Sequence, residues 1–73
     1  MTETEWRTNF SNNLKSAIAK YGCTRAEFAE EVGISVTALD NYIHCKRSPS
    51  AYILAKIARV LRCSMDDLAD PDL

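Results

Sequence analysis

The stretch from Thr24 to Ser50, TRAEFAEEVGISVTALDNYIHCKRSPS, predicts two short helices joined by one glycine. Thr24 can cap the first helix, and Glu27 three residues later completes a capping box, so we expect a helix over residues 25–32. Gly33 can adopt the positive φ that lets a chain leave one helix and begin another at a steep angle. This order of cap, helix, glycine and second helix is typical of a helix-turn-helix.

The second of these helices is expected over residues 36–44, with Ser35 as its N-cap. Its larger apolar side chains, Leu39, Tyr42 and Ile43, recur at a spacing that can face a core. The opposite face, here called the outward stripe, consists of Val36, Thr37, Asp40, Asn41 and His44. These side chains are mostly short and hydrogen-bonding, which favours a contact surface; an ordinary polar helix face is the alternative for Thr37 and Asn41.

Three further helices complete a predicted all-α fold of five helices, without strand patterns, repeats or linkers. The first is expected over residues 5–21, with Gly22 as its C-cap and with apolar positions Phe10, Leu14, Ala17, Ile18 and Tyr21 facing the core. The fourth is expected over residues 51–61, with Ser48 or Ser50 as its cap. A short fifth helix, over residues 65–69, follows a capping box of Ser64 and Asp67 and stops before Pro71. The chain is thus one domain of residues 1–73, with residues 1–4 and 70–73 expected to fray and no appended ligand-binding or cleavage domain.

An ordered set of motifs resembles the phage-repressor family of helix-turn-helix proteins, also called Cro-like or XRE-type. The resemblance covers about residues 10–68. It rests on Thr24-Arg25-x-Glu27-Phe28-Ala29, Val32-Gly33-Ile34-Ser35, Lys46-Arg47-x-Pro49-Ser50, Leu54-x-Lys56-Ile57-Ala58-x-x-Leu61 and Ser64-Met65-Asp66-Asp67-Leu68. Two positions depart from the family pattern: Arg25 stands where glutamine is usual, and Cys45 where glycine is usual. If the turn keeps the family geometry, Cys45 has a left-handed backbone that is strained for a residue with a side chain.

The resemblance implies that residues 36–44 lie in the major groove of duplex DNA. The positions that usually contact bases in the family are Val36, Thr37 and Asn41. Asn41 can bond adenine through two hydrogen bonds, while Val36 and the Thr37 methyl can pack on a thymine methyl. Asp40 can accept a hydrogen bond from cytosine N4, or it can repel phosphate.

Phosphate contacts are expected from basic and hydroxyl groups that flank the same helix. Arg25 begins a helix, where free backbone N–H groups already attract anions, and Ser35 caps the next one. Lys46 and Arg47 follow in the loop; a merely solvated charged loop is the alternative for these two.

The net charge of −1 conceals an uneven distribution of charges. Six of the ten acidic residues lie near the chain ends: Glu3, Glu5, Asp66, Asp67, Asp70 and Asp72. Between Trp6 and Met65 there are nine basic and four acidic residues, a net charge of +5. Because salt screens charges beyond about 8 Å, this local excess is what a nearby phosphate would experience.

The cysteines Cys23, Cys45 and Cys63 form no paired motif, and His44 is the only histidine, so we expect no metal site. Cys23 and Cys63 are interpreted as buried apolar residues, and Cys45 as exposed. Three unpaired thiols fit a reducing compartment, and no run reaches the ~20 apolar residues of a membrane helix. We therefore expect a cytoplasmic protein that does not contact membranes. No cofactor, small-molecule ligand or enzymatic activity is expected, since the sequence contains no phosphate loop and no plausible catalytic pair.

The function predicted from these features is sequence-specific DNA binding by a small transcriptional regulator, most simply a repressor. A homodimer is expected, because one such domain reaches few base pairs. Its surface is expected beyond the second helix of the motif, at Ala51, Tyr52, Leu68 and Leu73. The alternative is a protein-interaction module on the same fold, such as an antitoxin-like or anti-repressor partner, which the acid on the outward stripe and the acidic tail favour.

Overall fold

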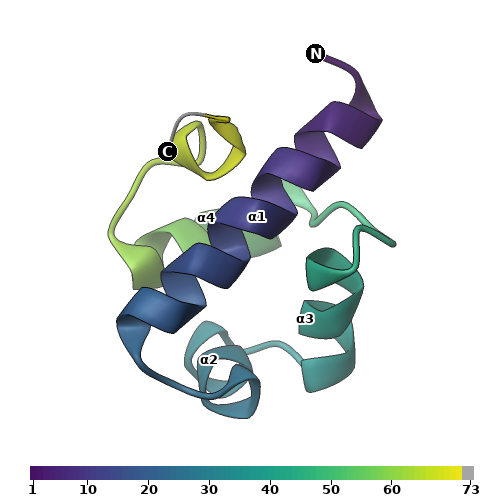
Figure 1. The fold of residues 1–73 in the computed structure, drawn as a ribbon. Coiled ribbons are helices and arrows are strands. Elements are labelled where there is room, and N and C mark those ends of the chain that lie inside the picture. The colour runs from purple at the N-terminus through teal and green to yellow at the C-terminus, as the bar shows by residue number, and fades with distance from the viewer. Residues whose placement is uncertain (72–73) are drawn as a thin grey trace.

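Four α-helices and one 3-10 turn make up the part of the chain that the computed structural model describes, residues 1–71. The elements are α1 (Glu3–Tyr21), α2 (Arg25–Val32), α3 (Val36–Ile43), α4 (Ala51–Leu61) and the 3-10 helix η1 (Asp67–Ala69). Figure 1 shows α1 crossing the molecule diagonally, with α4 behind it and α3 to one side. The all-α prediction is confirmed, because these residues contain no strand, and the boundaries of α2 and α4 agree with the expected ones.

The predicted fifth helix is corrected to a single 3-10 turn. Its capping box does form: the Asp67 N–H donates to Ser64 Oγ at 3.0 Å, and the Ser64 N–H donates to Asp67 Oδ2 at 3.3 Å. The bonds that follow are of the i to i+3 type, from Ala69 N to Asp66 O and from Asp70 N to Asp67 O, each at 3.2 Å. Too few residues precede Pro71, which has no N–H, for a full α-helical turn to develop.

The first helix begins at Glu3, two residues earlier than predicted. Thr2 caps it, and Glu5 Oε1 accepts from the Thr2 N–H at 3.0 Å to complete a capping box. Arg7 Nη2 lies 2.9 Å from Glu3 Oε2, an ion pair one turn apart. At the other end, Asp70 is bonded to Asp67 and accepts a hydrogen bond from α1; residues 72–73 of the predicted frayed segment lie outside the described residues.

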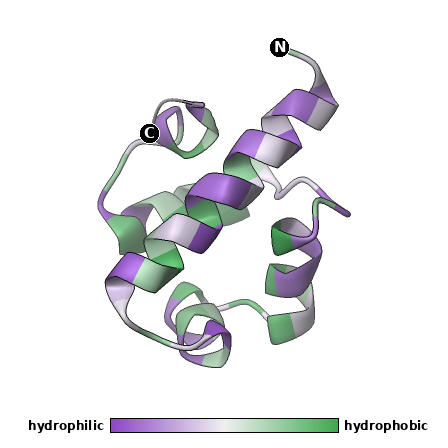
Figure 2. Ribbon diagram, in the orientation of Figure 1, coloured by the Kyte–Doolittle hydropathy of each residue, from purple (hydrophilic) through white to green (hydrophobic). Residues whose placement is uncertain are grey.

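The core forms where α1 packs against α3 and η1, and where α2 packs against α3 and α4. Figure 2 shows hydrophobic and hydrophilic positions mixed along each helix, as expected for helices that bury one face. The large side chains that are almost completely buried are Phe10, Leu14, Phe28, Leu39, Ile57 and Leu68. Within residues 1–71, none of the helices is long and apolar enough to cross a membrane.

Ala17, a predicted core position within α1, is partly buried. Three other predicted core positions are also only partly buried. Tyr21, expected to face the core, is 50% exposed and touches Phe28 with its ring edge at a centroid distance of 6.3 Å. Cys23 and Cys63 are partly buried rather than buried. All three lie at or just beyond the end of a helix, where the chain is leaving the core.

Candidate nucleic-acid interface

The turn between α2 and α3 is built from local hydrogen bonds and one glycine. Gly33 has φ of 87°, and its N–H and that of Ile34 both donate to the Ala29 carbonyl, closing the end of α2. A Cβ at Gly33 would lie 3.1 Å from Lys56 Nζ, in a backbone conformation that side chains disfavour. The predicted glycine turn is therefore present, and α3 begins two residues later with Ser35 Oγ accepting from the Ala38 N–H at 3.0 Å.

The outward stripe lies on the side of α3 away from the core. Leu39, Tyr42 and Ile43 are buried as expected. Of the stripe residues, Thr37 and His44 are exposed and Val36 retains 42% of its accessible surface, while Asp40 and Asn41 are partly exposed. The helix itself ends at Ile43, and His44 is the C-cap rather than the last helical residue.

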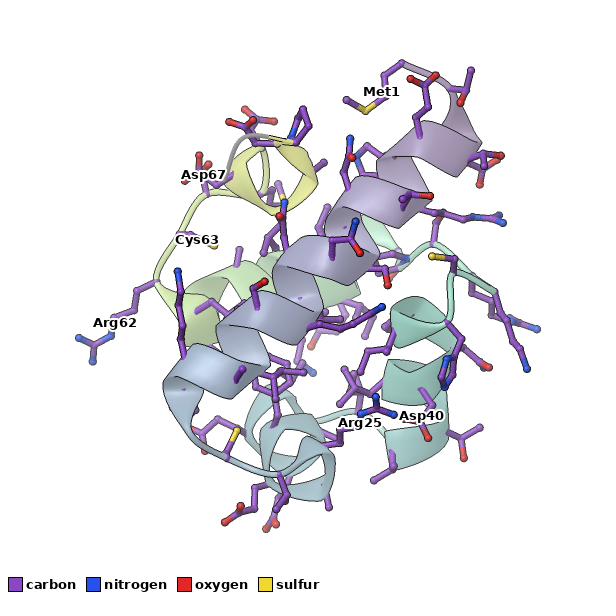
Figure 3. The ribbon with its side chains drawn as sticks, viewed as in Figure 1. Met1, Arg25, Asp40, Arg62, Cys63 and Asp67 are labelled. Atoms are coloured by element: carbon purple, nitrogen blue, oxygen red, sulfur yellow. The ribbon has the colours of Figure 1, made fainter. Side chains whose placement is uncertain are left out.

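An ion pair that the sequence did not predict crosses from α2 to this stripe. Arg25 Nη1 lies 3.2 Å from Asp40 Oδ1, and both side chains keep a large part of their accessible surface. Figure 3 shows the two labelled side chains beside each other. Arg25 was expected at a phosphate and Asp40 at a base, 15 residues apart in the chain, and only the packing of the two helices brings them together.

The loop after α3 presents the two expected cations to solvent. Lys46 and Arg47 are both exposed, and neither has an ion-pair partner within residues 1–71. Cys45 has φ of 61°, the left-handed conformation expected at the usual glycine position. The turn is closed by hydrogen bonds from Cys45 N to Tyr42 O at 3.2 Å and from Lys46 N to Asn41 O at 2.8 Å. Cys45 is partly buried, whereas the sequence predicts that it is exposed.

Helix α1 anchors this loop through contacts that sequence reasoning missed. The buried hydroxyl of Ser11 donates to the Ile43 carbonyl at the end of α3. The Cys45 Sγ lies 3.7 Å from the Arg7 carbonyl oxygen, and Arg7 Nε donates to Ser48 Oγ at 2.9 Å. The only local signal is a serine on the buried face of a helix, a position that requires a hydrogen-bond partner.

The predicted dimer residues divide into two groups. Ala51 and Tyr52 are exposed at the start of α4, with Tyr52 71% exposed and Lys56 Nζ 4.9 Å from its ring centroid. Leu68 is only 1% exposed because η1 packs it onto α1, so its prediction as a surface residue is wrong. Leu73 lies outside the described residues.

The pKa values of Glu27, in α2, and of Cys63, which follows α4, are displaced from their ordinary values. The pKa of Glu27 is lowered chiefly because its carboxylate accepts a hydrogen bond from the Thr24 backbone N–H. A hydrogen bond with the Thr24 side chain lowers this pKa further. Burial raises the pKa of the Cys63 thiol, and the nearby Asp67 charge raises it further. The first effect stabilises the start of α2, and the second disfavours the reactive thiolate form of Cys63.

Comparison with known proteins identifies the motif. A family model described as helix-turn-helix matches residues 14–68, which contain α2, α3 and α4. Among curated proteins, the chain is 43% identical over 51 residues to an uncharacterized HTH-type transcriptional regulator, YazB, of Bacillus subtilis (strain 168). That alignment covers 70% of this chain and 74% of the relative. No solved structure matches significantly. The chain belongs to the XRE-type helix-turn-helix family, the class of DNA-binding domain that its sequence resembles.

Proposed function

We propose that this protein is a transcriptional regulator that binds duplex DNA sequence-specifically, with α3 in the major groove. The observation that carries the proposal is the outward stripe of α3, exposed and flanked by Lys46 and Arg47, in a chain of this family. A helix-turn-helix reads DNA with the N-terminal part of its second helix, which here is the exposed end at Val36 and Thr37.

Base recognition is assigned to three members of the stripe. The Asn41 amide can donate to N7 and accept from N6 of adenine, a two-bond contact that other bases cannot reproduce. Val36 and the Thr37 methyl offer apolar surface to a thymine methyl. These contacts distinguish base pairs, whereas contacts to phosphate fix the position of the domain on the duplex.

Phosphate contacts are assigned to groups on both sides of α3. Ser35 Oγ accepts from the Ala38 N–H, which leaves its hydroxyl hydrogen to donate to a phosphate oxygen. Lys46 and Arg47 are exposed in the loop that α1 holds in place, so their charges are presented at a fixed end of α3. Arg25 has donors beyond the one that it uses on Asp40 and can add a further phosphate contact.

The proposal includes repression of transcription and the formation of a homodimer. A regulator that occludes a promoter needs only a DNA-binding surface and a second copy to lengthen the site. Ala51 and Tyr52, exposed beyond α3, are the residues that we assign to the contact between protomers.

The experiment is selection of bound sites from random duplex DNA at two salt concentrations. We expect one enriched motif with two-fold symmetry, and an affinity that falls steeply as salt rises. Enrichment of no motif at either salt concentration would reject sequence-specific binding.

A second candidate function is binding of a partner protein. A hollow lined by the apolar side chains of Met1, Trp6, Leu54 and Met65 is bordered by Asp66 and Asp70, and the outward stripe carries an acid but no Arg, Lys or Gln. This function would be favoured if site selection failed while a purified cognate protein formed a stable complex with the chain.

A further inference from the structure

The Arg25–Asp40 ion pair is one of only two ion pairs within residues 1–71, and it is the one that joins the two helices of the motif. Asp40 is also the only acidic residue between Glu31 and Asp66. An acid on the face proposed to enter the major groove requires an explanation, because a carboxylate near two phosphate backbones is repelled by them.

The geometry of the pair leaves part of each group available. Only Oδ1 of Asp40 receives Arg25 Nη1, at 3.2 Å, so Oδ2 can accept another hydrogen bond. The guanidinium in turn retains donors on its other nitrogens, and its charge offsets that of the carboxylate. Both side chains are substantially exposed, so this second oxygen and these donors can reach a ligand.

We propose that Arg25 and Asp40 form one reading unit, in which Arg25 orients Asp40 to accept a hydrogen bond from cytosine N4. This inference rests on the proposed function and adds to it the base that Asp40 selects. Arg25 is then a positioning residue for specificity, beyond any contact that it makes to phosphate.

The choice of cytosine follows from the groups that each base presents in the major groove. Cytosine presents the N4 amino donor, which suits a carboxylate. Guanine presents only the acceptors N7 and O6, and thymine the acceptor O4 with a methyl group, so both repel it. Adenine has a donor at N6 but also the acceptor N7 beside it, which a carboxylate oxygen cannot bond.

Arg47 provides a matched control. It is also an arginine flanking α3, but it is exposed and has no ion-pair partner within residues 1–71. If arginines at this surface act only through phosphate, Arg25→Ala and Arg47→Ala should behave alike. If Arg25 acts through Asp40, only Arg25→Ala should change the preferred sequence.

The test is site selection with wild type, Arg25→Ala, Arg47→Ala, Asp40→Asn and Asp40→Ala, each first checked for helicity by circular dichroism. We expect wild type and Arg47→Ala to select the same motif, with a cytosine in each half-site whose replacement weakens wild-type binding by about 10-fold. Arg25→Ala should lose most of that preference, and Asp40→Asn, of nearly identical shape, should change it to adenine. In the Asp40→Ala background, adding Arg25→Ala should leave the base preference unchanged, because the two residues act as a unit.

The outcomes separate this inference from the proposed function. If wild type selects a motif but Arg25→Ala selects the same one with uniformly lower affinity, Arg25 is a phosphate contact and the reading unit is rejected. An unchanged motif for Asp40→Asn also rejects it. If wild type selects no motif, the proposed function itself fails, and the reading unit fails with it.

Discussion

At the scale of single residues, backbone strain is concentrated at two helix ends. Among residues 1–71, Cys45 and Arg62 are the only non-glycine residues with positive φ, at 61° and 56°. The left-handed conformation costs a residue with a Cβ about 1–2 kcal/mol relative to the usual regions. Cys45 recovers part of that cost, because its Sγ contacts the Arg7 carbonyl oxygen and its side chain is partly buried.

Replacement of Cys45 separates these two contributions. Cys45→Gly removes the strain together with the thiol contact, and we expect a net rise in melting temperature of roughly 2–4 °C. Cys45→Ala removes the contact and keeps the strain, so it should lower the melting temperature. Thermal unfolding followed by circular dichroism measures both; a glycine variant less stable than the alanine variant would contradict the strain argument.

Substitution of Asn41 tests whether this single side chain recognises a base. Asn41→Ala should weaken binding to the selected site by roughly 1–3 kcal/mol, because the amide loses two hydrogen bonds to one base. Binding to random duplex DNA should change little, since phosphate contacts remain. Titrations on both DNAs by fluorescence anisotropy give the comparison, and equal losses on the two would make Asn41 a positioning residue.

At the scale of elements, the motif depends on how its helices begin. Thr24 and Glu27 form the capping box of α2 through a pair of hydrogen bonds, 3.1 Å from Glu27 N to Thr24 Oγ1 and 2.9 Å from Thr24 N to Glu27 Oε1. Helix α3 has a serine cap without a reciprocal acid and depends more on its buried face. Arg25 is the first residue of α2, so its position depends on the ionised Glu27 carboxylate of this capping box.

Acid should loosen the start of α2. The hydrogen bond from the Thr24 N–H lowers the folded-state pKa of Glu27 below its ordinary value, so this stabilisation is present above the unfolded pKa and is lost as the pH falls through the folded one. Glu27→Gln keeps an acceptor that does not titrate. Its melting temperature should fall less than that of wild type between about pH 6 and about pH 3. Glu30→Gln, an exposed glutamate on the same helix, is the control and should follow wild type; identical pH profiles for all three proteins would contradict the assignment.

The loop after α3 tests the electrostatic part of binding. Lys46→Ala and Arg47→Ala should each weaken binding to all sequences alike, and each should flatten the slope of log affinity against log salt by about 0.9. Arg62→Ala is the control, since Figure 3 shows Arg62 on the side of the molecule opposite α3. A loop variant that alters sequence preference with an unchanged salt slope would show that its residue is not a phosphate contact.

At the scale of the whole molecule, α1 holds the segments of the candidate interface in position. It holds the end of α3 through Ser11, the following loop through Arg7, and the C-terminal turn through Asn13. The buried Asn13 amide donates to the Leu68 carbonyl at 3.0 Å and to the Asp70 carbonyl at 2.8 Å. The molecule measures 31 × 21 × 20 Å, so even its longest dimension does not exceed one turn of duplex, about 34 Å.

Two copies bound one helical turn apart would double the contacts to DNA. Substitution of Tyr52 tests this arrangement. With so small a surface, we expect a weak dimer that forms fully on DNA. Sedimentation of wild type on a selected site should give two protomers per duplex, and Tyr52→Ala should reduce the cooperativity of binding. Tyr21→Ala, which alters a tyrosine that is 50% exposed at the end of α1, is the control. One wild-type protomer per site, or selected sites without two-fold symmetry, would reject the dimer.

Features that short stretches encode could be predicted from the amino-acid sequence. Caps at Thr24 and Ser35, the glycine turn at Gly33 and the apolar spacing of Leu39, Tyr42 and Ile43 depend on neighbours within a few residues. They therefore predicted the boundaries of α2, the start of α3 and the orientation of the stripe. The positive φ of Cys45 was expected from the family resemblance, because glycine is usual at that position. The family resemblance extended this to the DNA-binding class.

Contacts between groups far apart in the chain could not be predicted from the sequence, because the packing of the helices sets them. The Arg25–Asp40 pair, the Ser11 and Arg7 contacts to the α3 end, and the Asn13 amide join residues 15 to 57 positions apart. The same packing buried Leu68 and removed it from the predicted dimer surface. No periodicity encodes such contacts, because they depend on the distance and rotation between helices, which are set by the packing of the whole core.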